Sequence, residues 1–322
     1  MAQTSAVQDN MRKEVKLPYR RQGRLVRTWH HNKALWLLFL PCLLYYLIFR
    51  YAPMFGLVIT FKDYNLFKGI WASDWAGLKY YRMFFDNPDF WPLMKNTFLL
   101  GLYKLVFGFP APIILAILLN EVRKAAFKKF VQTVSYLPHF ISNVIVASMV
   151  IMFLSPTGGL INNLLGTFGI SPINFMNEPG LFRGIYVLSE IWQHIGWETI
   201  IYLAALTAID PQLYEAADMD GASRMRKIWH VTLPGISPAI VITLILNIGK
   251  VLEIGFEKVF LMQNPAIYDT ADIISTYVYR VGMEQGNFSY GASIDLFMGI
   301  ISLVFIYSAN YISRRVSETS LW

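Results

Sequence analysis

The sequence is poor in cysteine and in charged residues, and both shortages restrict what the chain can be. Among 322 residues there is one cysteine, Cys42, which lies inside an apolar run; an intramolecular disulfide and a thiolate metal cluster are therefore excluded. Charged residues make up 15% of the chain and hydrophobic residues 55%, whereas a soluble domain carries about a quarter charged residues. This composition predicts an integral membrane protein.

Several enzyme motifs are absent as well. The chain has no P-loop pattern G-x-x-x-x-G-K-[ST], and neither His-Glu-x-x-His nor Gly-x-Ser-x-Gly occurs, which excludes the usual signatures of ATP binding and intramembrane hydrolysis. The net charge of +7 could suit a nucleic-acid binder, but the Lys and Arg residues cluster in short segments beside apolar runs. We therefore expect no enzyme activity, no cofactor in this chain and no nucleic-acid partner.

Long apolar runs are what the sequence has in abundance. A helix needs about 20 mostly apolar residues to cross the hydrocarbon core, where lipid offers no partner to a free backbone group. The predicted fold class is thus an all-α integral membrane protein with about six transmembrane helices. The expected spans are 34–60, 98–119, 131–154, 184–208, 236–262 and 292–312.

The basic residues predict the orientation of the spans, because Lys and Arg are retained on the cytoplasmic side. They gather before span one, between spans two and three, and after span six, at Arg314 and Arg315. The first apolar run is too long for the core of a signal peptide. We expect a multi-pass plasma-membrane protein with both termini in the cytoplasm. Its predicted parts are a basic segment at 1–33, a transmembrane domain at 34–313 and a tail at 314–322.

One cytoplasmic connection, 210–235, has the features of a helical hairpin. Asp210 is expected to cap a helix that begins at Pro211, and Gly221 to close it in the left-handed conformation. A second helix should follow and end at Thr232-Leu233-Pro234. The expected apolar face of the second helix comprises Met225, Ile228, Trp229 and Val231.

The hairpin has the composition needed to insert into a groove of a partner protein. Short side chains at Ala216 and Ala217 permit close backbone approach, and Glu215 can meet a basic group. An amphipathic connector that lies at the membrane interface is the alternative that composition leaves open.

The spacing inside this segment resembles the EAA signature of permeases from binding-protein-dependent ABC importers. Glu215-Ala216-Ala217 is followed after three residues by Gly221 and after nine more by Val231-Thr232-Leu233-Pro234, with Val231 where the family usually has isoleucine. The resemblance implies a type I importer permease fold, in which the hairpin is the coupling helix and sits in a cleft of an ATPase subunit. The docking residues that it implies are Glu215, Ala216, Ala217, Asp220, Gly221, Val231, Leu233 and Pro234.

Further phrases are similar to those of sugar-type permeases related to the maltose importers. They include Phe61-Lys62-Asp63-Tyr64, Tyr136-Leu137-Pro138 and Gly286-Asn287-Phe288-Ser289-Tyr290. More narrowly, they resemble the branch that imports oligosaccharides such as pectin-derived uronic or rhamnogalacturonan fragments. The implied partners are a second permease, expected to be a distinct homologue, two subunits that bind ATP and Mg, and an extracellular, membrane-anchored substrate-binding protein.

Polar residues inside spans four and five mark a candidate translocation path, because ionisable groups within a membrane are costly and normally face the bundle interior. Four of them share one face of span four, and in span five Lys250 is spaced to pair with Glu253. A packing role that locks the two spans together is the alternative. The candidate path residues are Glu190, His194, Trp197, Glu198, Asn247, Lys250, Glu253 and Glu257.

A second class of transporter fits the same polar residues. A stand-alone secondary transporter could use the intramembrane Glu and His side chains as a proton relay. Such transporters usually contain internal repeats, and the sequence has none that we detect. The hairpin favours an external motor, and we therefore expect a permease subunit of an ATP-driven oligosaccharide importer.

Overall fold

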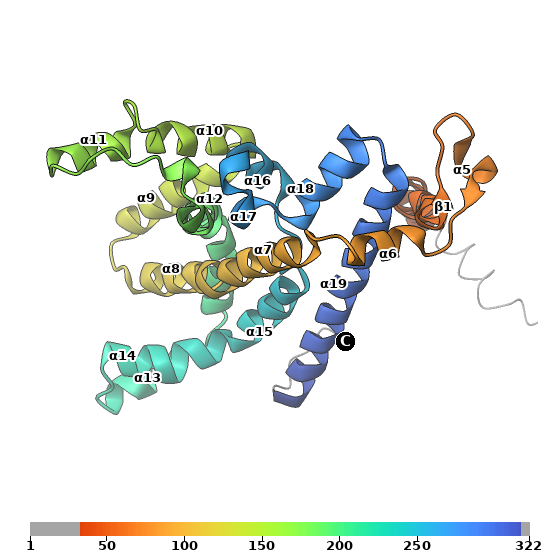
Figure 1. Ribbon diagram of the computed structural model, residues 1–322. Coiled ribbons are helices and arrows are strands. Elements are labelled where there is room, and N and C mark those ends of the chain that lie inside the picture. Colours follow the sequence, from red (N-terminus) through yellow and green to blue (C-terminus); the bar gives the residue numbers. More distant parts are fainter. Residues whose placement is uncertain (1–32, 317–322) are drawn as a thin grey trace, which may run out of the picture. The chain divides into compact units, whose positions relative to one another are not determined.

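The computed structural model describes residues 33–316, and almost all of their regular structure is helical (Figure 1). The predicted cytoplasmic segments 1–33 and 314–322 lie almost wholly outside the described residues. The first helical stretch runs without interruption from Lys33 to Phe61. It consists of α3 (Lys33–Tyr46), the π-helical η2 (Leu47–Tyr51), α4 (Ala52–Met54) and the 3₁₀ helix η3 (Phe55–Phe61).

A small two-stranded antiparallel sheet follows span one. Asp63 and Asp74 face each other across its two strands, an arrangement that repels because the charges are alike. Each carboxylate is paired with a lysine, Asp63 with Lys79 at 2.8 Å and Asp74 with Lys68 at 3.0 Å, and these pairs offset the repulsion. The elements of this region are β1 (Lys62–Asp63), α5 (Gly69–Ala72), β2 (Asp74–Trp75) and α6 (Lys79–Phe85).

Predicted spans one, two, four and six each fall in one continuous helical stretch, to within a residue. The described stretches long and apolar enough to cross a membrane are Lys33–Phe61, Phe90–Glu121, Arg224–Gly249 and Phe288–Arg315. Span two is formed by α7 (Phe90–Tyr103), the π-helical η4 (Lys104–Gly108) and α8 (Pro110–Glu121), and span six by α19 (Phe288–Val316). Span four is the 29-residue helix α12 (Pro179–Thr207), which carries the predicted polar face.

The prediction that span three is one continuous helix is wrong. Its two halves, Ala125–Phe140 and Asn143–Leu154, meet at an angle of 102°. Pro138 has no N–H to continue the helical hydrogen bonds, and Ser142 starts a new helix because its hydroxyl accepts from the Ile145 N–H at 3.4 Å. The elements are α9 (Ala125–Tyr136), the 3₁₀ helix η5 (Leu137–Phe140) and α10 (Asn143–Leu154).

Span five is also interrupted, contrary to the predicted continuous run 236–262. Helix α15 (Leu233–Gly249) ends before an irregular segment, and α16 (Phe256–Met262) begins after it. Gly249 and Gly255 flank the break, and glycine has poor helix propensity. In the break the apolar side chains of Val251, Leu252 and Ile254 are buried, whereas Lys250 and Glu253 are exposed.

The central helix of the bundle is α12, which packs against α8, α9, α15 and α17. Two apolar clusters lie along it, one around Tyr186 and Phe182 and one around Tyr202 and Leu206. The polar residues of α12 therefore lie between two apolar layers. The remaining elements are α11 (Leu160–Thr167), η6 (Phe175–Asn177), α13 (Pro211–Met219), α14 (Arg224–Lys227), η7 (Ile228–Thr232), η8 (Pro265–Ile267), α17 (Tyr268–Ala271), α18 (Ile274–Val278) and η9 (Tyr279–Glu284).

Candidate functional site

The first arm of the hairpin forms as its sequence predicts. Helix α13 begins at Pro211, and the Asp210 carboxylate accepts a hydrogen bond from the Gln212 N–H at 2.9 Å. Gly221 takes the left-handed conformation, with φ at +69°, and closes the helix. The Ala222 N–H then bonds the Ala217 carbonyl at 2.9 Å, which fixes the turn.

The predicted end of the second arm at residues 232–234 is wrong. Helices α14, η7 and α15 form one uninterrupted helix of 26 residues, Arg224–Gly249. In its π-helical turn the Leu233 N–H bonds the Ile228 carbonyl, one residue further back than in an α-helix. The wide turn makes room for Pro234, whose ring otherwise clashes with the carbonyl four residues earlier. The hairpin is therefore continuous with span five.

Polar and apolar contacts hold the two arms together. The Lys227 ammonium pairs with Asp218 at 2.7 Å, and the hydroxyls of Tyr214 and Thr232 lie 3.1 Å apart. Tyr214 and Val231 also pack against the apolar cluster at this end of α12. That cluster comprises Ile113, Ala116, Tyr202, Leu206, Ile209 and Ile236.

The opposite face of the hairpin is exposed and unusually apolar for a surface. Met219 is 89% exposed, Met225 63% and Trp229 62%. Val231 and Ile228, predicted to share that face, are half-buried. Of the predicted docking residues, Glu215, Ala216, Asp220, Gly221 and Pro234 are exposed, and Ala217, Val231 and Leu233 are half-buried. The sequence analysis did not include Met219 and Leu213 among the docking residues, although apolar residues close to the alanine pair indicate a contact surface.

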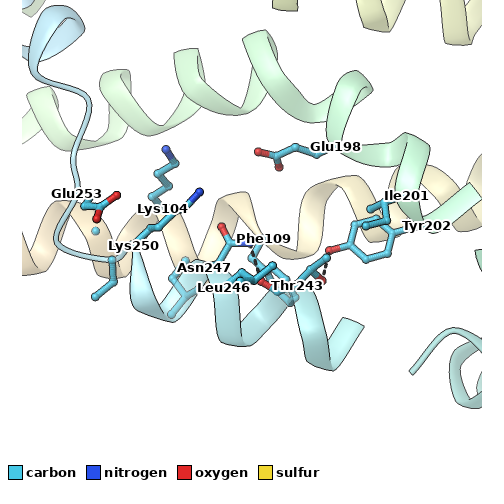
Figure 2. A pocket seen from close by; sticks show the side chains of 13 residues that line it. Lys104, Phe109, Glu198, Ile201, Tyr202, Thr243, Leu246, Asn247, Lys250 and Glu253 are labelled. Carbon is cyan, nitrogen blue, oxygen red and sulfur yellow. Dashed lines mark hydrogen bonds between the residues drawn. The ribbon is translucent and has the colours of Figure 1, made fainter. Parts of the chain in front are cut away.

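The second site is a cavity of about 390 Å³ between α7, α12 and α15. In Figure 2 the Lys104 and Lys250 side chains extend into the space between the carboxylates of Glu198 and Glu253. Asn247 contributes an amide to the same wall. The cavity thus offers cations, carboxylates and an amide around one volume.

Most of the predicted path residues line two adjoining cavities. Glu198, Asn247, Lys250 and Glu253 line the first, and Glu190 and His194 line a smaller one that shares Glu198 and Asn247 with it. Glu257 instead accepts a hydrogen bond from the Asn143 amide at 3.1 Å. The interruption of span five explains the position of Glu257, because residues 250, 253 and 257 do not follow one helical face.

The predicted pairing of Lys250 with Glu253 is not formed. Within the described residues these side chains make no ion pair with each other, although the Glu253 N–H bonds the Lys250 carbonyl at 2.9 Å. Lys250 follows the last residue of α15, so the helical spacing on which the prediction depended does not apply.

Glu190 is the centre of a buried ionic network. Its two oxygens bind Lys258 at 2.9 Å and Lys104 at 3.1 Å, and the Lys258 ammonium also donates to the Gln193 amide oxygen at 2.9 Å. Lys258 is 1% exposed. The Glu190–Lys258 pair joins α12 to α16, which is the kind of contact that the packing alternative describes. The sequence analysis missed both Lys104 and Lys258, although a lysine within an apolar run indicates a candidate functional residue in itself.

His194 is not isolated, because the bend in span three brings His139 against it. Their Nδ1 atoms lie 3.0 Å apart, and the Trp197 ring stacks on the His139 ring at 4.6 Å between centroids. This cluster holds η5 against α12. No group of three or more metal-binding side chains occurs among residues 33–316.

Gly101 sets how closely α7 approaches the cavity wall. A Cβ built at Gly101 lies 1.8 Å from the Val251 carbonyl oxygen, which is backbone and cannot move without shifting Lys250 and Glu253. We expect Gly101→Ala to reduce transport several-fold, whereas Gly166→Ala, which has open space around its Cβ, leaves it unchanged. Uptake measured at equal membrane levels of the two variants tests this; equal rates would contradict the close packing.

Comparison with known proteins gives a consistent result. Residues 108–318, more than half of the chain, match the family model described as "Binding-protein-dependent transport system inner membrane component". The polygalacturonan/rhamnogalacturonan transport system permease protein YteP of Bacillus subtilis is 48% identical over 94% of both chains. Protein LplB of the same organism is 46% identical and covers 90% of this chain and 92% of its own length.

A solved structure extends the similarity to the fold. It is the crystal structure of a bacterial ABC transporter involved in the import of the acidic polysaccharide alginate. One chain of it is 41% identical, with a TM-score of 0.85, and the match covers 91% of this chain and 99% of that chain.

Proposed function

This chain belongs to the family of binding-protein-dependent transport system inner membrane components and is a permease of an ABC sugar importer. From this premise we propose that its cargo is an acidic oligosaccharide derived from polygalacturonan or rhamnogalacturonan. We further propose that the hairpin 210–235 docks onto an ATPase subunit that binds ATP and Mg, and that an extracellular binding protein delivers the cargo. A second permease, a distinct homologue, completes the path.

The observation that carries the docking proposal is the exposed apolar face of the hairpin. Met219, Met225 and Trp229 are each more than half exposed, and the hairpin that bears them is braced by buried contacts to the base of α12. A helical face of this kind is suited to a groove of a partner protein. The charge distribution of the sequence supports a cytoplasmic location for it, with both termini on the same side.

The continuous helix supplies a mechanical link between the two sites. At about 1.5 Å per residue, the 26 residues of Arg224–Gly249 form a helix about 39 Å long, which begins in the hairpin and ends at the cavity wall. Asn247 lies in the last turn of this helix and Lys250 directly after it. A displacement of the hairpin by an ATPase is therefore transmitted to the cavity wall.

The cargo proposal is supported by the relatives and by the chemistry of the cavity. Lys104 and Lys250 can pair with uronate carboxylates, whereas Asn247, Glu198 and Glu253 can accept hydrogen bonds from sugar hydroxyls. A neutral sugar would offer no carboxylate to Lys250, which makes no ion pair with the described residues.

Purification from native membrane in mild detergent tests the docking proposal. We expect an ATPase and a second permease to copurify with the wild-type chain. With Met219→Asp, which places a charge on the apolar face, the second permease should still copurify and the ATPase should not. Phe168→Asp is the matched control, because Phe168 is 81% exposed but lies far along the chain from the hairpin. Copurification of the ATPase with Met219→Asp at the wild-type ratio would refute docking through this face.

A further inference from the structure

The network around Glu190 holds one more cation than it needs. Lys258 and Lys104 both pair with the single Glu190 carboxylate, so these three groups together carry one positive charge, beside the Glu198 carboxylate of the same cavities. The two lysines differ in their surroundings, and this difference decides which of them is available to a ligand.

Lys258 is the permanent partner of Glu190. Its side chain is 1% exposed and its ammonium has two oxygen partners, Glu190 and Gln193, both at 2.9 Å. A buried ammonium without its carboxylate would be costly. Lys258 therefore stays on Glu190 and keeps the carboxylate neutralised whatever Lys104 does.

Lys104 is the exchangeable partner. Its side chain is 41% exposed and lies at the wall shared by the two adjoining cavities. It sits in the π-helical turn η4, and such turns are frequent at functional sites. When Lys104 leaves Glu190, no buried carboxylate is left unpaired, because Lys258 remains in place.

We propose that Lys104 is a carboxylate-binding residue of the translocation cavity, and that it exchanges Glu190 for a uronate group of the cargo. This inference rests on the proposed function and names the group through which the cargo is recognised. The carboxylates of Glu198 and Glu253 on the same cavity repel the uronate from their own positions and receive hydroxyls instead. The acidic group of the cargo is thus directed to the cations of the cavity, and Lys104 is the one that gives up a carboxylate partner to receive it.

Chemical restoration of the charge tests the proposal in the assembled importer. Lys104→Cys is prepared in a Cys42→Ala background, which removes the sole native cysteine. The full complex with its binding protein is reconstituted in vesicles, and uptake of tetragalacturonate is measured. We expect Lys104→Cys to lower uptake at least tenfold, about 1.4 kcal/mol. Aminoethyl methanethiosulfonate, which rebuilds a lysine-like cation, should restore most of the rate, and the neutral ethyl reagent should not.

Because the reagents act after folding, a loss that the cation alone reverses supports a role of the charge. Equal rates with both reagents, or no loss in Lys104→Cys, would overturn the proposal. Lys95→Cys is the matched control, an exposed lysine on the same span, and should keep wild-type uptake. Absence of tetragalacturonate uptake by the wild-type complex would instead overturn the proposed cargo, so the two failures are distinguishable.

Discussion

Replacement of Gly221 by tryptophan is expected to abolish the coupling between ATP hydrolysis and transport, with at least a tenfold loss of cargo-stimulated ATPase activity. Gly221 stands at the tip of the hairpin with φ at +69°, and no atom lies within 4 Å of a Cβ built there. The open space is therefore on the outer side of the turn, where the proposed ATPase binds. A large side chain fills that space and also strains the left-handed backbone by about 1–2 kcal/mol.

The control for this prediction distinguishes the effect of a large side chain at the hairpin tip from the effect of backbone strain alone. Gly169 has φ at +76° and equally open surroundings, so Gly169→Trp carries the same backbone cost in a different loop. We expect Gly169→Trp to retain coupled hydrolysis and both variants to insert into the membrane. ATPase assays on reconstituted complexes test this. Equal activities of the two variants would exclude the hairpin tip from the coupling mechanism.

The hairpin could be predicted from the sequence because its determinants are local. Asp210, Pro211 and Gly221 act on backbone groups within a few residues of themselves, and capping rules describe such effects well. Pro234 shows the limit of this reasoning. A proline commonly ends a helix, but a wide turn of five residues accommodated it here, and the sequence alone does not distinguish the two outcomes.

The ionic network could not be predicted in the same way, because its members are distant in sequence. Lys258 binds a carboxylate 68 positions earlier, and Lys104 reaches the same group from another span. Helical spacing pointed to Lys250 and Glu253 as a pair, but the break after Gly249 removed the helix that this spacing assumes. The polar face of span four could be located from the sequence, whereas its division into a packed part and a cavity-lining part depends on tertiary contacts.

Loss of the Lys258 side chain is expected to have the largest effect on stability. In Lys258→Met, Glu190 keeps only the partly exposed Lys104, and the Gln193 amide oxygen loses its donor. Removal of one partner from a buried ion pair costs about 3–5 kcal/mol, so we expect a clear fall in the melting temperature of the purified complex. Lys250→Met is the control, since Lys250 is exposed and makes no ion pair with the described residues, and it should melt like the wild type.

A double variant shows whether the loss of stability in Lys258→Met comes from the Glu190 charge that Lys258 no longer neutralises. In the double variant Glu190→Gln with Lys258→Met, no uncompensated charge remains between α12 and α16, and Lys104 is exposed enough to be solvated. The double variant should therefore be more stable than Lys258→Met alone, a non-additivity that a double-mutant cycle measures directly. If the losses in free energy of unfolding from the two substitutions simply add, the charges of Glu190 and Lys258 do not stabilise each other, and the two side chains contribute only through packing. If the double variant recovers stability, the loss in Lys258→Met comes from the charge of Glu190 that Lys258 normally neutralises.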